Sequence, residues 1–301
     1  MTLLDRAVVR LLPAVPKPVV RRLSSRYIAG ERLEDAVATV RRLNGRGKLA
    51  TVDVLGEEIT NEDEASAIAD EYLDVLEAIE REHLDANISV KLTGFGLNLG
   101  YDVARENLAR VVERAAARGI FVRIDMEDSS TTDDTLQLYR ELRAEGHDGI
   151  GVVLQASLRR TLADIPGLVD VRVCKGIYVE PPELQLQDPD EVRRSFVEVV
   201  EALFDQGAYV AIATHDEWVV RQTLELLRRR GLGPSEYELQ MLLGVREKLG
   251  GSLVQSGHRL RIYVPYGRYW YEYSVRRLQE NPRVAGYVAA DVLGRLVPRR
   301  G

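Results

Sequence analysis

The chain has 301 residues, 45% of them hydrophobic and 29% charged, which supplies the core of one large domain and argues against extended disorder. The formal net charge is -6, but residues 1–48 hold eleven Lys and Arg against four Asp and Glu. That leader therefore carries +7 and the remainder -13. An acidic body argues against nucleic acid as a partner.

The cysteine count, the apolar runs and the first residues indicate the cellular compartment. The single cysteine, Cys174, rules out an internal disulfide, and four histidines with one cysteine predict no metal site. No apolar run approaches the roughly 20 residues that cross a bilayer. Asp5, Arg6 and Arg10 interrupt the first residues, so we expect no signal peptide and a cytoplasmic protein.

The first predicted elements form an N-terminal helical arm, residues 1–48. One apolar stripe at helical spacing runs over residues 3–12 and another over 33–43, with prolines between them. One interpretation is an arm that packs on the following domain or on another subunit in a homo-oligomer. A second is a basic amphipathic patch that binds the inner face of an anionic cell membrane as a peripheral protein. A third, an organelle import signal, is disfavoured by Asp5.

From residue 49 to 301 the pattern is that of a single catalytic domain. Short β-type runs alternate with amphipathic helices, and several runs are almost wholly apolar, as strands covered on both faces should be. No G-x-G-x-x-G follows the first run, which argues against a Rossmann domain. The pattern predicts an α/β fold, a distorted (β/α)8 TIM-type barrel. The eight runs are 50–55, 87–92, 120–125, 149–154, 169–174, 208–213, 237–242 and 260–265.

Chemistry in such a barrel lies at the carboxyl ends of the strands. Polar residues fall at that end of most predicted strands, and burying them without use is costly. Each alone also has a structural explanation: a Lys91–Asp125 ion pair, a solvated Glu127–Asp128 loop, or a helix cap at His215. The residues at these ends are Lys91, Asp125, Met126, Gln155, Arg172, Lys175, Gly176, Tyr178, Thr214, His215, Asp216 and Tyr263.

A helical segment near the end of the chain, 269–281, stops before Pro282. Tyr273, Arg276, Arg277 and Glu280 fall on one face of it. Two adjacent guanidiniums suit a small carboxylate, because each offers paired donors. An exposed Arg276–Glu280 pair at i,i+4 spacing explains the pattern equally well.

These segments, taken in order, resemble the proline dehydrogenase family over about residues 50–285, both its short bacterial form and the matching domain of proline utilisation A. Their order and their place at strand ends make the resemblance specific. The segments are SerValLysLeuThr (89–93), IleAspMetGlu (124–127), Gln155, ArgValCysLysGlyIleTyr (172–178), AlaThrHisAsp (213–216), GluLeuGlnMetLeuLeuGly (238–244), ArgIleTyrValPro (261–265) and TyrSerValArgArgLeuGlnGluAsn (273–281).

The resemblance implies an enzyme that oxidises L-proline to Δ1-pyrroline-5-carboxylate with non-covalent FAD. It places Arg172 near flavin N5 and implies that a membrane quinone accepts the electrons. The residues implied to bind the cofactor are Asp125, Met126, Gln155, Arg172, Lys175, Gly176, Thr214, His215, Asp216 and Glu280.

The substrate site is implied in the same way. Lys91, Asp125, Arg172 and Tyr178 are the implied catalytic residues. The residues implied to bind proline are Lys91, Tyr178, Leu242, Tyr263, Tyr273, Arg276 and Arg277. Glu57 follows the first strand, so it should lie at the same barrel mouth as the C-terminal helix. The resemblance implies that Glu57 pairs with Arg276 as a gate when substrate binds.

Three residues depart from the family pattern. Asp216 replaces a usual Asn and places a negative charge near the polar groups of the flavin. Ile177 replaces a usual Ala and should tighten the pocket, and Cys174 replaces an aliphatic residue. Two other functions stay open: a Schiff-base aldolase that uses Lys91 or Lys175, and a non-catalytic relative that binds proline or flavin.

Overall fold

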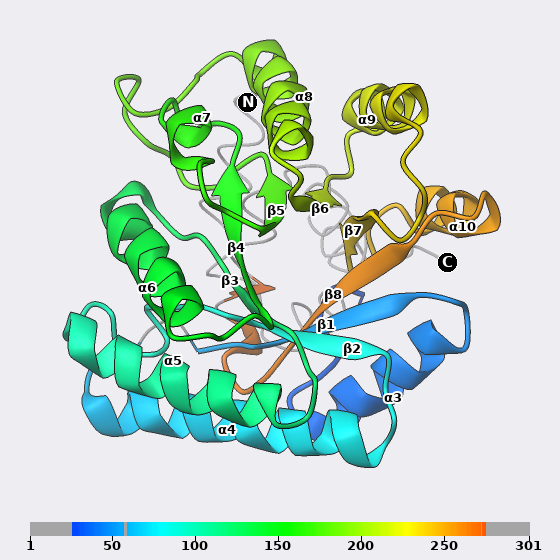
Figure 1. Ribbon diagram of the computed structural model, residues 1–301. Coiled ribbons are helices and arrows are strands. Elements are labelled where there is room, and N and C mark those ends of the chain that lie inside the picture. Colours follow the sequence, from blue (N-terminus) through cyan, green and yellow to red (C-terminus); the bar gives the residue numbers. More distant parts are fainter. Residues whose placement is uncertain (1–25, 57–58, 272, 275–301) are drawn as a thin grey trace, which may run out of the picture.

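The computed structural model describes residues 26–56, 59–271 and 273–274. The predicted helix over 3–12 and the candidate residues Glu57, Arg276, Arg277 and Glu280 lie outside these residues. Within them, eight parallel strands close into a barrel in the order β1 to β8 (Figure 1). This confirms the predicted (β/α)8 barrel.

All eight predicted runs are strands, with ends shifted by up to two residues. The strands are β1 (Leu49–Val54), β2 (Ala86–Val90), β3 (Val122–Ile124), β4 (Ile150–Gln155), β5 (Asp170–Cys174), β6 (Tyr209–Ala213), β7 (Tyr237–Leu242) and β8 (Leu260–Tyr266). Lys91 and Asp125 were expected to end their strands, but each lies one residue beyond.

Helices between the strands form an outer layer, and their starts carry local signals. Asn61 caps α4 by accepting the Glu64 N–H at 3.0 Å, and Asp188 caps α8. The crossover between β4 and β5 has the shortest helix, α7. The helices are α3 (Leu33–Asn44), α4 (Glu62–Arg81), α5 (Tyr101–Ala116), the 3-10 turn η2 (Ser129–Thr131), α6 (Thr132–Ala144), α7 (Thr161–Asp164), α8 (Pro189–Asp205), α9 (Glu217–Arg230) and α10 (Glu247–Gln255).

Helix α3 lies in the described part of the predicted arm, residues 26–48. It packs against β1 and β8, and Val40 and Leu43 join the main hydrophobic core. A helix that precedes β1 thus covers the outer face of the two strands that close the barrel. In the part of the chain that the structure describes, no helix is both long and apolar enough to cross a membrane.

The inside of the barrel is polar, whereas such barrels are usually filled by branched apolar side chains. Arg123 is buried, and its Nη1 donates to the carbonyls of Val152 and Asp170 at 3.0 and 2.9 Å. Gly151 makes room for it, because a Cβ there would lie 2.4 Å from Arg123 Nη1. Polar side chains inside the barrel must bond to one another, since each unpaired buried group is costly.

Tyr72 of α4 joins β1 and β2 where their pairing ends, at Asp53 opposite Ser89. Its buried hydroxyl accepts the Val54 N–H at 3.1 Å and donates to the Ser89 carbonyl at 2.6 Å. The hydroxyl therefore satisfies two main-chain groups at the carboxyl ends of these strands, beside Asp53.

Tyr72→Phe is expected to lower the free energy of unfolding by about 1–3 kcal/mol, because it leaves buried main-chain groups without partners. Tyr139→Phe is the matched control, since the Tyr139 hydroxyl accepts one partly buried N–H, that of Val169, at 3.2 Å. Urea unfolding of both variants should show the larger loss for Tyr72→Phe. Equal losses would contradict this account.

Candidate active site

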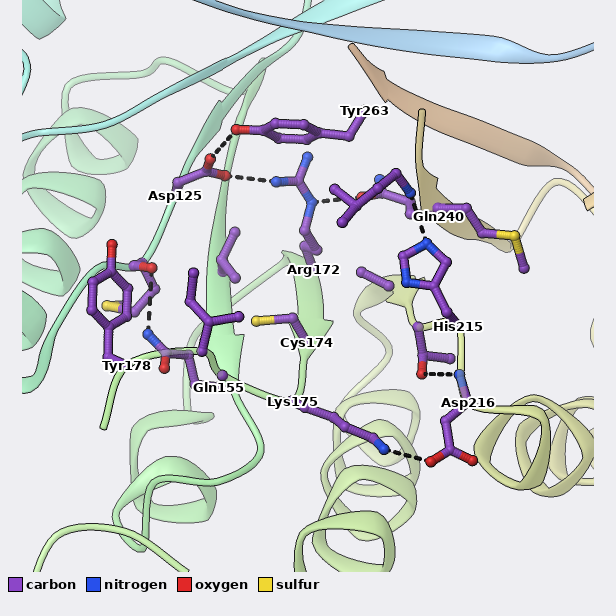
Figure 2. Close-up of a pocket in the computed structure, with 18 of the residues that line it drawn as sticks. Asp125, Gln155, Arg172, Cys174, Lys175, Tyr178, His215, Asp216, Gln240 and Tyr263 are labelled. Atoms are coloured by element: carbon purple, nitrogen blue, oxygen red, sulfur yellow. Dashed lines mark hydrogen bonds and ion pairs between the residues drawn. The ribbon is translucent and has the colours of Figure 1, made fainter. Parts of the chain in front are cut away.

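A cavity of about 390 Å³ opens at the carboxyl ends of the strands (Figure 2). Every candidate residue that the structure describes lines it. These are Lys91, Asp125, Met126, Gln155, Arg172, Lys175, Gly176, Tyr178, Thr214, His215, Asp216, Leu242, Tyr263 and Tyr273. Barrel closure thus brings together residues that are up to 182 positions apart.

Arg172 of β5 and Asp125 form the centre of the site. Arg172 Nη1 donates to Asp125 Oδ1 at 2.6 Å and to Ser89 Oγ at 3.1 Å. The Tyr263 hydroxyl donates to the other carboxylate oxygen, Asp125 Oδ2, at 2.7 Å. The guanidinium carbon lies 5.3 Å from the centre of the Tyr263 ring, within range of a cation–π contact. Figure 2 shows the side chains of Arg172, Tyr263 and Asp125 converging, the first two from β5 and β8 and the third from the residue after β3.

Lys91 has a partner that the sequence analysis missed. Its Nζ lies 2.7 Å from Asp53 Oδ1, 3.1 Å from the Tyr263 hydroxyl and 3.7 Å from Asp125 Oδ2. The expected Lys91–Asp125 pair is therefore present, but the closer carboxylate is Asp53, which is fully buried. A lone carboxylate inside the apolar run 50–55 was the available signal.

Burial and charge give the groups at the centre opposite pKa shifts. Burial alone would raise the pKa of Asp125, but the charges of Arg172 and Lys91 and the bonds from Ser89 and Tyr263 hold it below its usual value. Burial, reinforced by the Asp125 charge, raises the pKa of Tyr263 well above its usual value. Near neutral pH the Asp125 carboxylate is therefore ionised and the Tyr263 phenol beside it is neutral.

Gln155 and Gly176 form one wall of the cavity. The Gln155 amide donates to the carbonyl of Glu127 at 2.5 Å, which fixes the side chain against the loop after β3. Gly176 has a φ of +97°, and a Cβ there would lie 2.4 Å from Ser157 Oγ and 2.7 Å from Gln155 Oε1. Only glycine fits this backbone position without displacing Gln155.

The mouth of the cavity contains an ion cluster of Lys175, Arg193 and Asp216. The Asp216 carboxylate accepts from Lys175 Nζ at 2.5 Å and Arg193 Nε at 2.8 Å, and it caps α9. The negative charge of Asp216 is thus matched by two cations. His215 lies beside it, and its Nε2 accepts the Leu242 N–H at 2.9 Å.

The pKa of Asp216 predicts a pH effect on stability. Burial would raise that pKa, but the bonds from Lys175 and Arg193 outweigh burial and lower it. A lowered folded-state pKa gives stability that is present above the unfolded value of about 3.9 and is lost as the pH falls below it. We expect Asp216→Asn to lose about 1 kcal/mol at pH 7, since water screens the partly exposed cations.

Urea unfolding of the wild type and Asp216→Asn from pH 7 to pH 2.5 measures this difference. It should stay constant above about pH 5 and shrink at lower pH, because the Asn variant has no group there to protonate. Asp188→Asn is the matched control, because Asp188 caps α8 in the same way. A difference independent of pH would contradict the assignment.

Cys174 and Ile177 also line the cavity. Burial raises the pKa of the Cys174 thiol to about 11, so it is protonated and a poor nucleophile near neutral pH. Ile177 is 49% exposed and lies at the mouth. The expectation that Ile177 tightens the pocket stays a prediction.

Tyr273 enters the cavity from the segment after β8, where residues 270, 271, 273 and 274 are helical. It packs with Ile28 and Leu55 in a small buried cluster. Ile28 is held there because the next residue, Ala29, donates its N–H to the Pro265 carbonyl at 2.9 Å. The segment of the arm before α3 therefore contributes to the position of Tyr273. The expected Glu57–Arg276 gate and the roles of Arg277 and Glu280 fall outside the described residues.

The sequence analysis also missed Gln240 as a site residue. Gln240 lines the cavity, and its Oε1 accepts from Arg172 Nε at 2.5 Å. Its segment, 238–244, was noticed as a motif, but the polar positions in it were assigned no role. Among the described residues, buried Arg172 Nη2 has no hydrogen-bond partner. A buried cationic donor that no described residue uses suits an acceptor atom of a bound molecule.

The chain was compared with known proteins. The model of the proline dehydrogenase family matches residues 36–180 and 188–290. Proline dehydrogenase 1 of Bacillus subtilis subsp. natto is 36% identical over 272 residues, which cover 89% of this chain and 90% of that protein. Proline dehydrogenase of Deinococcus radiodurans is 34% identical over 279 residues, which cover 90% of each chain.

Solved structures show the same fold. Proline utilization A of Bdellovibrio bacteriovorus matches with a TM-score of 0.82 and 22% identity, over 91% of this chain and 36% of that one. The protein of that name from Bradyrhizobium japonicum gives a TM-score of 0.75 with 23% identity, over 92% and 34%. This chain spans about a third of either protein. At these identities the likeness concerns the barrel alone.

Proposed function

Because this chain belongs to the proline dehydrogenase family, we propose that it catalyses the FAD-dependent oxidation of L-proline to Δ1-pyrroline-5-carboxylate. This would be the first step of proline catabolism toward glutamate. The observation that carries the proposal is Arg172, held by Asp125 and Gln240 with Nη2 left unpartnered among the described residues.

The lining of the cavity fits a flavin. Apolar side chains such as Met126 and Leu242 suit a ring system, and Arg172 Nη2 offers a donor for a ring nitrogen or oxygen. When bound, FAD would accept a hydride at N5. The residues that would hold FAD are Asp125, Met126, Gln155, Arg172, Lys175, Gly176, Thr214, His215, Asp216 and Glu280.

Arg172 would favour the reaction by its charge. A cation held beside the position of N5 stabilises the negative charge that develops on the ring. The bonds to Asp125, Ser89 and Gln240 fix the guanidinium before substrate binds, so little reorganisation is needed during the reaction.

The remaining pocket residues would hold proline. Lys91, Asp125 and Tyr263 contact one another and would form one side of the substrate site. Tyr178, Leu242 and Tyr273 would enclose the ring, with Arg276 and Arg277 on the carboxylate. Closing of Glu57 onto Arg276 would exclude water once substrate is bound. The amine must be neutral when hydride leaves, because removal of hydride from a cation is disfavoured.

An anaerobic titration with L-proline tests the function. The purified protein should be yellow and should lose its flavin absorbance as proline is added. L-alanine, which has the amine and carboxylate without the ring, is the control and should leave the colour unchanged. A yellow protein that proline does not bleach would be a binding protein. A colourless protein that borohydride traps with a carbonyl compound through Lys91 or Lys175 would be an aldolase.

We also propose that a membrane quinone accepts the electrons of the reduced flavin. Anaerobic reoxidation by a soluble quinone analogue should be faster than reoxidation by dioxygen in the same buffer. The opposite order would refute a quinone as the acceptor. The enzyme would then work in the cytoplasm beside the membrane.

Residues 1–48 are proposed to form an arm and residues 49–301 the catalytic barrel. The packing of α3 on β1 and β8 supports the first interpretation of the arm, contact with the barrel itself. Sedimentation with anionic and with neutral vesicles tests the membrane alternative. Analytical ultracentrifugation tests contact between subunits.

A further inference from the structure

We propose that Glu238 is a positioning residue that fixes the direction of the Arg172 guanidinium through the amide of Gln240. Glu238 and Gln240 are two residues apart on β7, so their side chains lie on the same face of the strand. Gln240 Nε2 donates to Glu238 Oε1, and Gln240 Oε1 accepts from Arg172 Nε at 2.5 Å. The three side chains therefore form a continuous relay inside the barrel.

The chemistry of the two ends allows one orientation of the amide. A carboxylate only accepts hydrogen bonds and a guanidinium only donates them. Gln240 must therefore turn its NH2 group to Glu238 and its oxygen to Arg172. A flipped amide would place oxygen against carboxylate and NH2 against guanidinium, which is two repulsions in place of two bonds. The orientation of the amide thus depends on Glu238.

The surroundings of the Glu238 carboxylate favour its charged form. It is buried, yet Arg261 Nε donates to its Oε1 at 2.8 Å, and Arg261 Nη1 donates to the Ala50 carbonyl at 2.7 Å. Burial would raise the pKa of Glu238, but the Arg261 charge and the hydrogen bonds outweigh burial and lower it. The relay is therefore anchored to β8 and β1, below the cavity.

The Arg172 guanidinium is therefore held by hydrogen bonds on two of its sides. Gln240 holds Nε, while Asp125 and Ser89 hold Nη1. The planar guanidinium is then fixed in rotation, and so is the direction of Nη2. Without Glu238 the amide can turn, Nε loses its acceptor and the guanidinium can rotate about its remaining bonds. The relay itself is independent of the proposed function. Its effect on flavin reduction rests on the proposed function, in which Arg172 acts on the bound flavin.

Removal of the acceptor at position 238 tests the relay. Glu238→Leu leaves the Gln240 amide without an acceptor at that end, and it should slow flavin reduction at saturating proline about tenfold, with a change of less than about twofold in the proline KM. Glu238→Gln is the rescue variant, because Arg261 Nε and Gln240 Nε2 both donate to Oε1 of Glu238 and a glutamine oxygen accepts both. It should keep most of the wild-type rate. Should Glu238→Leu not fold, Glu238→Leu/Arg261→Met removes both partners of the buried pair and takes its place.

Asp170→Asn is the matched control. Asp170 pairs with buried Arg123 inside the barrel and makes no bond to Gln240 or Arg172 among the described residues. It should lower the unfolding temperature without slowing flavin reduction. A Glu238→Leu variant that reduces its flavin at the wild-type rate would overturn the relay. So would a Glu238→Gln variant as slow as Glu238→Leu.

Crystal structures separate this inference from the proposed function. In Glu238→Leu the Arg172 guanidinium should rotate away from its wild-type direction, and in Glu238→Gln it should keep that direction. Should proline fail to reduce the wild type, the proposed function falls while these structures still decide the relay. An unmoved guanidinium in Glu238→Leu would then refute it.

Discussion

Arg172→Met is expected to slow proline-dependent flavin reduction by about three orders of magnitude, the upper range for loss of a preorganised donor. Methionine fills similar volume but carries neither charge nor donors. The variant loses the bonds to Asp125, Ser89 and Gln240 as well as the unpartnered Nη2. Its dissociation constant for FAD should rise too, because the cavity loses a cation.

Arg172→Lys is the matched control for this prediction. Lysine keeps the charge, but one ammonium group cannot reproduce the planar fork that reaches Gln240 on one side and Asp125 on the other. Stopped-flow reduction should place it between the wild type and Arg172→Met. If Arg172→Met is reduced within twofold of the wild-type rate, Arg172 is structural and the proposed site is wrong.

Lys91→Met is expected to lower the free energy of unfolding by about 3–5 kcal/mol, the usual cost of removing one partner of a buried pair. Lys91 Nζ lies 2.7 Å from Asp53 Oδ1, and that aspartate side chain has no exposed surface. Water therefore cannot screen the charge that Lys91 now balances, and an uncompensated buried carboxylate is costly. Activity should fall with stability, because Lys91 also contacts Tyr263 at 3.1 Å.

A double-mutant cycle isolates the pair. Asp53→Asn in the Lys91→Met background should recover part of the loss, because it removes the charge that lysine had balanced. Urea unfolding of the wild type, both single variants and the double variant measures the coupling. If the two single losses simply add, the Lys91–Asp53 pair does not stabilise the fold.

Much of this barrel was predictable from local pattern. Apolar runs such as 150–154 indicate strands covered on both faces, and the helical stripes between them indicate parallel crossovers. Parallel strands in a barrel place all their carboxyl ends at one mouth. From that rule, Lys91, Asp125 and Arg172 were expected to lie together at this mouth. The cavity opens there, and every described candidate lines it.

The partners inside the barrel were not predictable in this way. In the sequence Asp53 is a carboxylate within an apolar strand, and no local pattern indicates that its partner is Lys91, which follows the next strand. The partners of Glu238 and Gln240 were equally hidden. Their spacing puts them on one face of β7, but it does not indicate contact with Arg172, which lies on β5. Such choices depend on register and on which side chains share the interior.

By itself, then, the sequence determined the succession of strands and helices and the end of the barrel where polar groups gather, because hydrophobic periodicity and strand direction are local properties. Closure decided the rest. Because β8 pairs with β1 and β1 pairs with β2, Tyr263 of β8 lies beside Lys91, which follows β2. Inside the closed barrel Tyr263 also reaches Asp125, which follows β3. Closure also decided that α3 covers β1 and β8 and that the arm reaches Tyr273. Contacts between distant strands follow from the three-dimensional register, which no single segment of the chain contains.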